Sequence, residues 1–214
     1  MAEIKALAAG YKKFYERYFA SGDDTYRELA ETGQAPKTLI VACSDSRVDP
    51  SIITDAGPGD IFVIRNVANV VPPYEKDGGL HGVSAALEFA VKILGVKHIV
   101  VLGHSRCAGV DALLDGNAEE RTDFIGAWVA AALPAKEKAL AEIRGDDHDR
   151  RALRRRCAQE NVLLSLARLR TFPWIDERVA SGALRLHGWY FSLRTGALSE
   201  YKPDVESFVD LPTA

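Results

Sequence analysis

Cysteine is scarce in this chain of 214 residues, which contains three, and methionine is scarcer still, with one. Three cysteines do not make the disulfide framework of a small secreted domain. In a reducing compartment, cysteine chemistry instead means metal binding or catalysis. No stretch approaches the roughly 18 consecutive apolar residues that a membrane-spanning helix requires. The sequence therefore predicts a protein that is neither disulfide-stapled nor membrane-spanning.

A surplus of either charge is also lacking. Lysine and arginine together number 27 against 30 aspartates and glutamates, which gives a formal net charge of -3. Such a balance provides no general attraction to nucleic acid or to an anionic membrane. The first twenty residues carry charges throughout and have no apolar core of the signal-peptide type, so we expect a cytoplasmic location. Neither nucleic acid nor membrane is an expected partner.

One local exception to this balance is a cluster of arginines between residues 150 and 156. It comprises Arg150, Arg151, Arg154, Arg155 and Arg156. Acidic residues lie close by in the sequence, at 146, 147 and 149. A solvated helix face is the interpretation that this mixture of charges favours, rather than a nucleic-acid patch.

Hydrophobic periodicity indicates an α/β protein. Apolar residues at helical spacing predict helices at 3–20, 23–32, 82–94, 106–114, 121–131, 134–144 and 149–170. Continuous apolar runs, which are typical of strands buried on both faces, predict strands at 37–42, 61–64 and 98–102, with further strands at 183–191 and 197–201. Strand–helix–strand order implies right-handed parallel crossovers. We expect a central, mostly parallel β-sheet flanked by helices.

The length suits one domain, and no repeat, low-complexity tract or linker divides the chain. We expect a single domain over 1–214, with an N-terminal helical arm at 1–33 and an α/β core at 34–214. The helix predicted at 3–20 is amphipathic and rich in aromatic residues. It packs either on its own sheet or on a neighbouring subunit.

Two segments follow buried strands with residues that a hydrophobic core would not accept. CysSerAspSerArg (43–47) follows the strand predicted at 37–42, and GlyHisSerArgCys (103–107) follows the strand predicted at 98–102. Ligands bind outside the carboxyl ends of strands in open parallel sheets, and both segments reach that edge. Residues about sixty positions apart are therefore expected to meet there.

Two thiols and an imidazole at this edge predict a catalytic zinc site. Cys43, His104 and Cys107 supply three ligands, and three protein ligands leave the fourth position free for solvent. Zinc bound by two thiolates and one imidazole carries less positive charge than zinc bound by neutral ligands alone. Such a site therefore requires neighbouring residues that help to produce hydroxide near neutral pH. Arg47 can hold the Asp45 carboxylate in its ionised form, and that carboxylate can orient the nucleophile. Cys157 has no partner motif and reads as a buried hydrophobic residue.

At this point the sequence resembles the β-class carbonic anhydrases. The blocks that carry the resemblance span nearly the whole chain: GlnAlaProLys (34–37), AlaCysSerAspSerArgVal (42–48), ArgAsnValAlaAsn (65–69), GlyHisSerArgCys (103–107) and HisGlyTrp (187–189). The stretch at 65–74 is most similar to the plant-type branch. The resemblance implies one Zn²⁺ per chain on Cys43, His104 and Cys107, with Asp45 and Arg47 as a catalytic dyad. In a closed form of the family, Asp45 would itself be the fourth ligand.

The resemblance also implies a substrate pocket. Gln34 would donate a hydrogen bond to the substrate, and Phe62, Val67 and Phe89 would form an apolar wall. Phe89 stands where the plant-type pattern usually has tyrosine. Ala108 followed by glycine stands where the family commonly has two glycines. The family assembles as dimers or multiples of dimers, with the N-terminal helix gripping the neighbour and some pocket walls supplied across the interface.

The activity implied is the reversible hydration of CO2 to bicarbonate and a proton, by attack of zinc-bound hydroxide on CO2, which makes the protein a carbonate dehydratase. Two alternatives remain open: hydrolysis of CS2 or COS on the same scaffold, and a non-catalytic zinc- or bicarbonate-binding module. Comparing turnover on CO2 with turnover on CS2 or COS would distinguish the first alternative from CO2 hydration. The presence of Asp45 and Arg47 argues against the second. A zinc dehydrogenase is excluded because no glycine-rich dinucleotide fingerprint is present.

Overall fold

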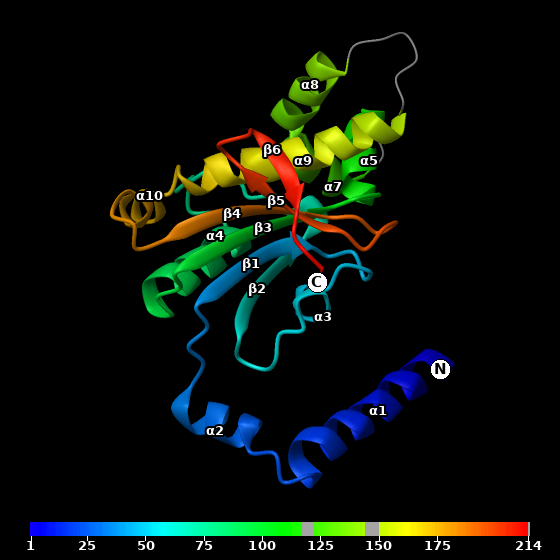
Figure 1. The fold of residues 1–214 in the computed structure, drawn as a ribbon, viewed down its shortest axis with the longest axis vertical. Helices are drawn as coiled ribbons and strands as arrows, with labels where there is room; N and C mark the ends of the chain where they lie inside the picture. The colour runs from blue at the N-terminus through cyan, green and yellow to red at the C-terminus, as the bar shows by residue number, and fades with distance from the viewer. Residues whose placement is uncertain (117–121, 144–149, 214) are drawn as a thin grey trace.

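The computed structural model describes residues 1–116, 122–143 and 150–213. It confirms the α/β fold class: a six-stranded sheet with helices on its faces (Figure 1). The strands lie in the order β2-β1-β3-β4-β5-β6. Their bounds are β1 (Thr38–Cys43), β2 (Ile61–Asn66), β3 (His98–His104), β4 (Arg185–Phe191), β5 (Leu198–Lys202) and β6 (Ser207–Asp210).

The first four strands of the sheet are parallel, and the last two are antiparallel. Strand β1 lies inside the parallel set, because it pairs with β2 on one side and with β3 on the other. Its residues from Leu39 to Ala42 are at most 1% exposed. Burial on both faces explains why the sequence shows a continuous apolar run there instead of alternation.

Helices surround this sheet. They are α3 (Pro50–Thr54), α4 (Gly82–Glu88), α5 (Ala108–Asp115), α7 (Ile125–Ala130), α8 (Leu133–Glu142), α9 (Arg150–Leu169) and α10 (Pro173–Ala180). The largest apolar cluster lies on one face, where Leu39, Val41 and Val101 meet Val162 of α9 and Leu87 of α4. A smaller cluster on the opposite face contains Ile40, Ala42, Val100 and Leu102.

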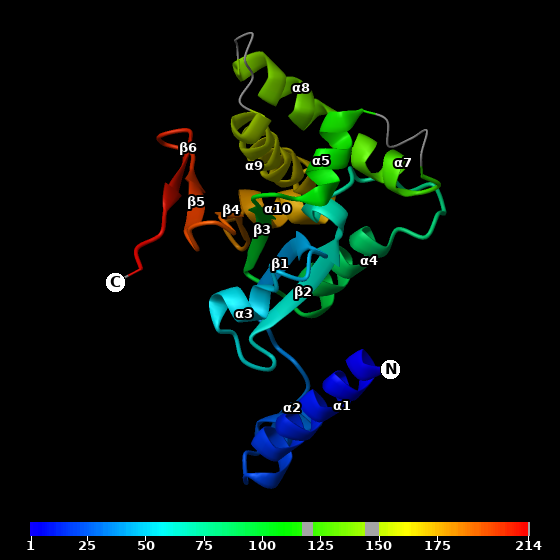
Figure 2. The same cartoon turned by 90° about the vertical axis from the view of Figure 1, so that its right-hand side faces the viewer.

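The N-terminal arm stands away from this core. It consists of α1 (Ala2–Tyr15), a π-helical turn (Glu16–Ala20) and α2 (Thr25–Thr32). Figures 1 and 2 show α1 projecting from the body of the molecule. No residue of α1 is buried, and Leu7 and Tyr11 are 72% and 64% exposed. In the single chain this helix therefore does not pack on its own sheet, and its packing on a neighbouring subunit stays a prediction.

Most predicted elements are confirmed within a few residues, and several short elements in the described part of the chain were missed. The helix predicted at 82–94 is α4 followed by a π-helical turn (Phe89–Ile93). Helices α3 and α10 and strand β6 are short elements that the periodicity did not reveal. The predicted helix ends at 121, 144 and 149 lie outside the described residues. No helix in the described part of the chain is long and apolar enough to cross a membrane.

Candidate metal centre

Two neighbouring strands deliver the first two donor side chains to one edge of the sheet. Cys43 is the last residue of β1, and His104 is the last residue of β3. These strands are parallel and adjacent, with Ala42 opposite Leu102, so their carboxyl ends lie side by side. Cys107 follows three residues later and stands at the N-cap of α5. The predicted convergence of the two segments is confirmed.

The three side chains form a compact, buried donor cluster. Their ligand atoms all lie within 4.8 Å of one another. Cys43, His104 and Cys107 are 5%, 0% and 3% exposed. The two Sγ atoms are 3.9 Å apart and both cysteines are free thiols. Tetrahedral zinc with Zn–S bonds near 2.3 Å requires sulfurs about 3.8 Å apart, so this spacing fits that ion.

The histidine is oriented for metal binding. Its Nδ1 lies 2.9 Å from the carbonyl oxygen of Ser105. A carbonyl only accepts, so Nδ1 carries the proton and the lone pair of Nε2 is left for a ligand bond. His104 Nε2 is buried and has no hydrogen-bond partner in the described part of the chain. A buried polar atom without a partner is costly, and a metal ion at the cluster would satisfy it.

The two thiols titrate as a pair. The hydrogen bond with Cys107 lowers the pKa of Cys43, and the same bond together with burial raises the pKa of Cys107. Backbone N–H groups at the start of α5 act in the opposite direction and lower the pKa of Cys107. The site therefore favours one thiolate when only protons are present. A divalent cation would stabilise the second thiolate by its own charge.

A carboxylate–guanidinium pair lies directly beyond the first cysteine. Asp45 accepts from Arg47 at both oxygens: Nε to Oδ1 is 2.9 Å and Nη2 to Oδ2 is 2.7 Å. The backbone N–H of Arg47 also donates to Oδ1, at 3.0 Å. These bonds from Arg47 hold the pKa of Asp45 well below its usual range. The carboxylate is therefore ionised and fixed beside the donor cluster.

A second arginine, which the sequence analysis did not single out, fixes this loop. Arg65 on β2 donates to the carbonyl of Cys43 at 3.0 Å, to the carbonyl of Asp45 at 2.7 Å and to the Asp49 carboxylate at 2.8 Å. One planar guanidinium thus ties both ends of the turn that carries the metal donor and the dyad. The signal was its place at the start of ArgAsnValAlaAsn, next to a strand end.

Close backbone approach beside the cluster explains one glycine. A Cβ on Gly109 would lie 2.7 Å from Cγ1 of Val67 and 2.9 Å from Cβ of Ala68. Ala68 itself adopts a positive φ of 62°. Ala108, by contrast, is exposed. The departure from two glycines therefore falls at the position that tolerates a side chain, and the required glycine is present.

The structure does not bring the other pocket residues to this edge within one chain. Gln34 is exposed and precedes β1, at the end of that strand opposite to Cys43. Phe62 pairs with Leu39, four positions before Cys43, or about 13 Å along the strand. Phe89 stacks on Phe62, with ring centroids 5.9 Å apart. Only Val67, 38% exposed, lies next to the cluster in the same chain.

Comparison with protein families gives the affiliation of this chain. A family model described as carbonic anhydrase matches residues 38–198, which include all three donor residues and the Asp45–Arg47 pair. The chain belongs to the β-class carbonic anhydrases. It is 45% identical over 170 residues to β carbonic anhydrase 5, a chloroplastic protein of Arabidopsis thaliana. That match covers 78% of this chain and 54% of the relative, so the chain spans about half the length of that protein.

Solved structures of carbonic anhydrases share the fold over nearly the full length. The β-carbonic anhydrase CcaA superposes with a TM-score of 0.88 at 35% identity, covering 98% of this chain and 100% of that one. One of two tetrameric β-carbonic anhydrases from Sordaria macrospora superposes with a TM-score of 0.71 at 33% identity, covering 93% of each chain. Membership of the plant-type branch stays a prediction.

Proposed function

We propose that this carbonic anhydrase carries one Zn²⁺ per chain on Cys43, His104 and Cys107 and catalyses the reversible hydration of CO2. The observation that carries the proposal is the donor cluster itself: two sulfurs 3.9 Å apart and a buried, unpartnered imidazole nitrogen, with an ionised carboxylate fixed alongside. The family of the chain supports the same reaction.

The residues around the cluster have distinct parts in the proposed reaction. Zinc, when bound, would lower the pKa of a water in its open fourth position and so supply a nucleophile at neutral pH. Asp45 would accept a hydrogen bond from the attacking water and so orient it toward CO2. Arg47 keeps Asp45 ionised and directed, and Arg65 keeps the whole turn in place. While Arg47 holds both Asp45 oxygens, this carboxylate is engaged away from the metal position.

A neighbouring subunit completes the substrate pocket in this proposal. Gln34, Phe62 and Phe89 lie at the amino end of β1 and β2, too far from Cys43 of their own chain to touch its substrate. Phe89 is 43% exposed, although it is a large aromatic side chain stacked on Phe62. Placed against Val67 of a second chain, the two rings would wall a space for an apolar molecule, and Gln34 would donate to one oxygen of bicarbonate.

The N-terminal arm supports the same assembly. On the projecting helix, Ile4, Leu7 and Tyr11 are exposed and no residue is buried, and an exposed apolar face of this kind is typical of an interaction surface. We therefore propose a homo-oligomer, a dimer or a multiple of dimers, in which the arm packs on the neighbouring subunit. The tetrameric assembly named for the Sordaria proteins is compatible with this arrangement. A cytoplasmic location is part of the proposal.

Stopped-flow measurement of CO2 hydration, with zinc determined in the same samples, tests the function. Samples depleted of metal by a chelator and reloaded with graded zinc provide the series. We expect the initial rate to rise in proportion to zinc up to one ion per chain. A fully zinc-loaded protein that hydrates CO2 no faster than buffer would refute the proposal. Neither CS2 or COS hydrolysis nor a non-catalytic role is favoured by the relatives.

A further inference from the structure

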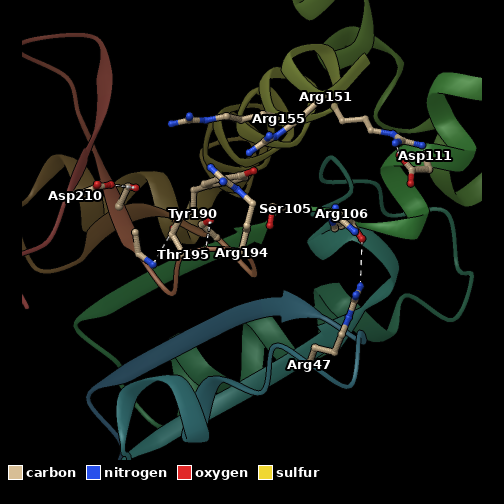
Figure 3. Close-up of a pocket in the computed structure, with 14 residues that line it drawn as sticks. Arg47, Ser105, Arg106, Asp111, Arg151, Arg155, Tyr190, Arg194, Thr195 and Asp210 are labelled. Carbon is tan, nitrogen blue, oxygen red and sulfur yellow. Dashed lines mark hydrogen bonds and ion pairs between the residues drawn. The ribbon is translucent and has the colours of Figure 1, made fainter. Parts of the chain in front are cut away.

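A second concave region adjoins the metal centre, and of its lining residues the proposed reaction uses Arg47 alone. It is a cavity of about 620 Å³ at the carboxyl edge of the sheet. Its walls come from the turn after β1, the turn before α5, the first half of α9, and the connection between β4 and β5 (Figure 3). A volume of this size is that of a small-molecule site and far exceeds what CO2 or bicarbonate fills.

Positive charge is concentrated in this cavity. Six arginines line it, against two aspartates, Asp111 and Asp210. The arginines are Arg47, Arg106, Arg151, Arg154, Arg155 and Arg194. The chain as a whole has a formal net charge of -3, so the excess is local and does not follow from composition. A concave wall of one sign focuses the potential and raises the local concentration of counter-ions.

Part of this charge is already neutralised by contacts within the chain. Arg47 holds Asp45, and Arg154 lies 2.6 Å from the Asp111 carboxylate. Arg106, Arg155 and Arg194 differ from these. Their guanidinium groups make no hydrogen bond or ion pair with any residue of the part of the chain that the structure describes. Three separate segments thus each contribute an unpaired cation to one cavity.

Hydroxyl groups lie between these cations. Ser105, Ser192 and Thr195 line the same cavity as the unpaired arginines. The oxygen of Ser105 accepts from the backbone N–H of Leu193 at 2.9 Å, which leaves its O–H to donate. Guanidinium forks with nearby hydroxyl donors are the groups that bind phosphate oxygens bidentately. Charged and hydroxyl side chains predominate in this lining, in which Tyr190 and Ala197 are the less polar members.

The arrangement on α9 agrees with the interpretation of the basic run as a solvated helix face, because Arg151 and Arg155 are exposed, and it adds that this face borders a cavity. Arg151, Arg154 and Arg155 face a cavity that they share with Arg106 and Arg194 from other segments. Like charges at positions i and i+4, such as Arg151 and Arg155, disfavour a helix. An anion placed between them would remove that repulsion.

We propose that this cavity binds a small organic polyanion of the phosphate-ester class, at a site separate from the metal centre. The unpaired guanidinium groups of Arg106, Arg155 and Arg194 would hold its phosphate oxygens, and the hydroxyls of Ser105 and Thr195 would complete the contacts. A monovalent anion such as bicarbonate would leave most of this charge unmatched. Binding does not depend on the proposed catalytic function.

Calorimetric titration of the zinc-loaded protein with fructose 1,6-bisphosphate, at fixed ionic strength, tests the proposal. The variant Arg155→Gln/Arg194→Gln removes two of the three unpaired cations. The matched control Arg17→Gln/Arg185→Gln removes the same net charge from exposed positions elsewhere, in the N-terminal arm and at the opposite end of β4. We expect the dissociation constant to weaken at least tenfold in the cavity variant and to stay within twofold in the control.

A third variant separates geometry from charge. Arg155→Lys/Arg194→Lys keeps both charges but loses the bidentate fork, so we expect weakening that is intermediate between the wild type and the glutamine variant. Thermal unfolding of each variant verifies that it is folded. The proposal is overturned if the wild type shows no saturable binding up to about ten millimolar probe, or if the cavity variant binds as tightly as the wild type, which would place the probe at the metal or elsewhere. Equal weakening in the control, which would indicate unspecific charge attraction, overturns it as well.

Discussion

The two ends of β1 differ within a single chain: functional residues at its carboxyl end are buried and hydrogen-bonded, whereas those around its amino end are exposed. At the carboxyl end, the donors Cys43 and His104 are buried and the adjoining turn is tied by Arg65. At the amino end, Gln34 is exposed and Phe89 is 43% exposed. The comparison teaches that the donor cluster and the Asp45–Arg47 pair are complete within one chain, whereas the proposed substrate pocket requires two chains.

The largest expected effect is at the carboxyl end. Replacing a donor, as in His104→Ala or Cys107→Ala, removes one of three ligands from the proposed zinc site, so we expect both the metal and the hydration activity to be lost. Metal analysis and stopped-flow assays on the same preparation measure this. Cys157→Ala is the matched control, because Cys157 is also a buried free thiol. If His104→Ala retained one zinc ion per chain, His104 would not be a required ligand and the proposed zinc site would be wrong.

The next effect concerns the dyad. Asp45→Asn preserves shape but removes the charge that Arg47 holds, and the amide would also present a donor where an acceptor is required. We expect zinc content to stay near one per chain while turnover falls about a hundredfold, which is the size of effect typical of a positioned acid–base group. Asp204→Asn, at an exposed turn, provides the control. Full turnover in Asp45→Asn would show that the Asp45 carboxylate has no role in the reaction.

The arm gives the third test. Leu7→Ser/Tyr11→Ser replaces two exposed apolar side chains that share a face of α1. If these side chains are buried against a neighbour, their loss should weaken subunit association by about tenfold or more. Light scattering across a concentration series measures the change, with Lys5→Ser/Lys13→Ser as the control on the same helix. A wild-type protein that is monomeric and fully active would show that the amino-end surface is complete without a partner.

The smallest expected effect concerns packing beside the donors. Gly109→Ala places a methyl group 2.7 Å from Val67 and 2.9 Å from Ala68. Overpacking of this kind costs about 1–3 kcal/mol of unfolding free energy. Gly82→Ala is the control, because a Cβ there has no neighbour within 4 Å and the residue is also at the start of a helix. Chemical denaturation of both variants measures the difference in unfolding free energy. Equal stability of the two variants would show that the close approach of Val67 and Ala68 does not require glycine at position 109.

The features at the carboxyl end of β1 were predictable from the sequence to different degrees. Strands β1 and β3 and the convergence of Cys43 with His104 were predictable, because a buried parallel strand has a distinctive apolar run and its polar end must lie at the ligand edge. Arg65 was not predicted, since its role depends on three carbonyl and carboxylate oxygens that only the folded turn brings together.

Other features escaped sequence analysis for different reasons. Strand β6 has four residues at the sheet edge, too few for a period to show. Helix α10 begins with Pro173, a start signal that the periodic pattern alone did not use. The separation between Phe62 and Cys43 could have been predicted from the sequence. Phe62 is near the start of its strand, whereas Cys43 is the last residue of the neighbouring parallel strand. Which chain meets which across an interface is not contained in hydrophobic periodicity.

X-ray absorption at the zinc edge of the purified protein tests the central claim most directly, since it counts and identifies the atoms around the metal. Two sulfurs near 2.3 Å and two nitrogen or oxygen atoms near 2.0–2.1 Å are expected, one from His104 and one from solvent. Addition of a small inhibitory anion should then replace only the solvent ligand. A shell of four protein ligands that the anion leaves unchanged, or a shell with fewer than two sulfurs, would contradict the account.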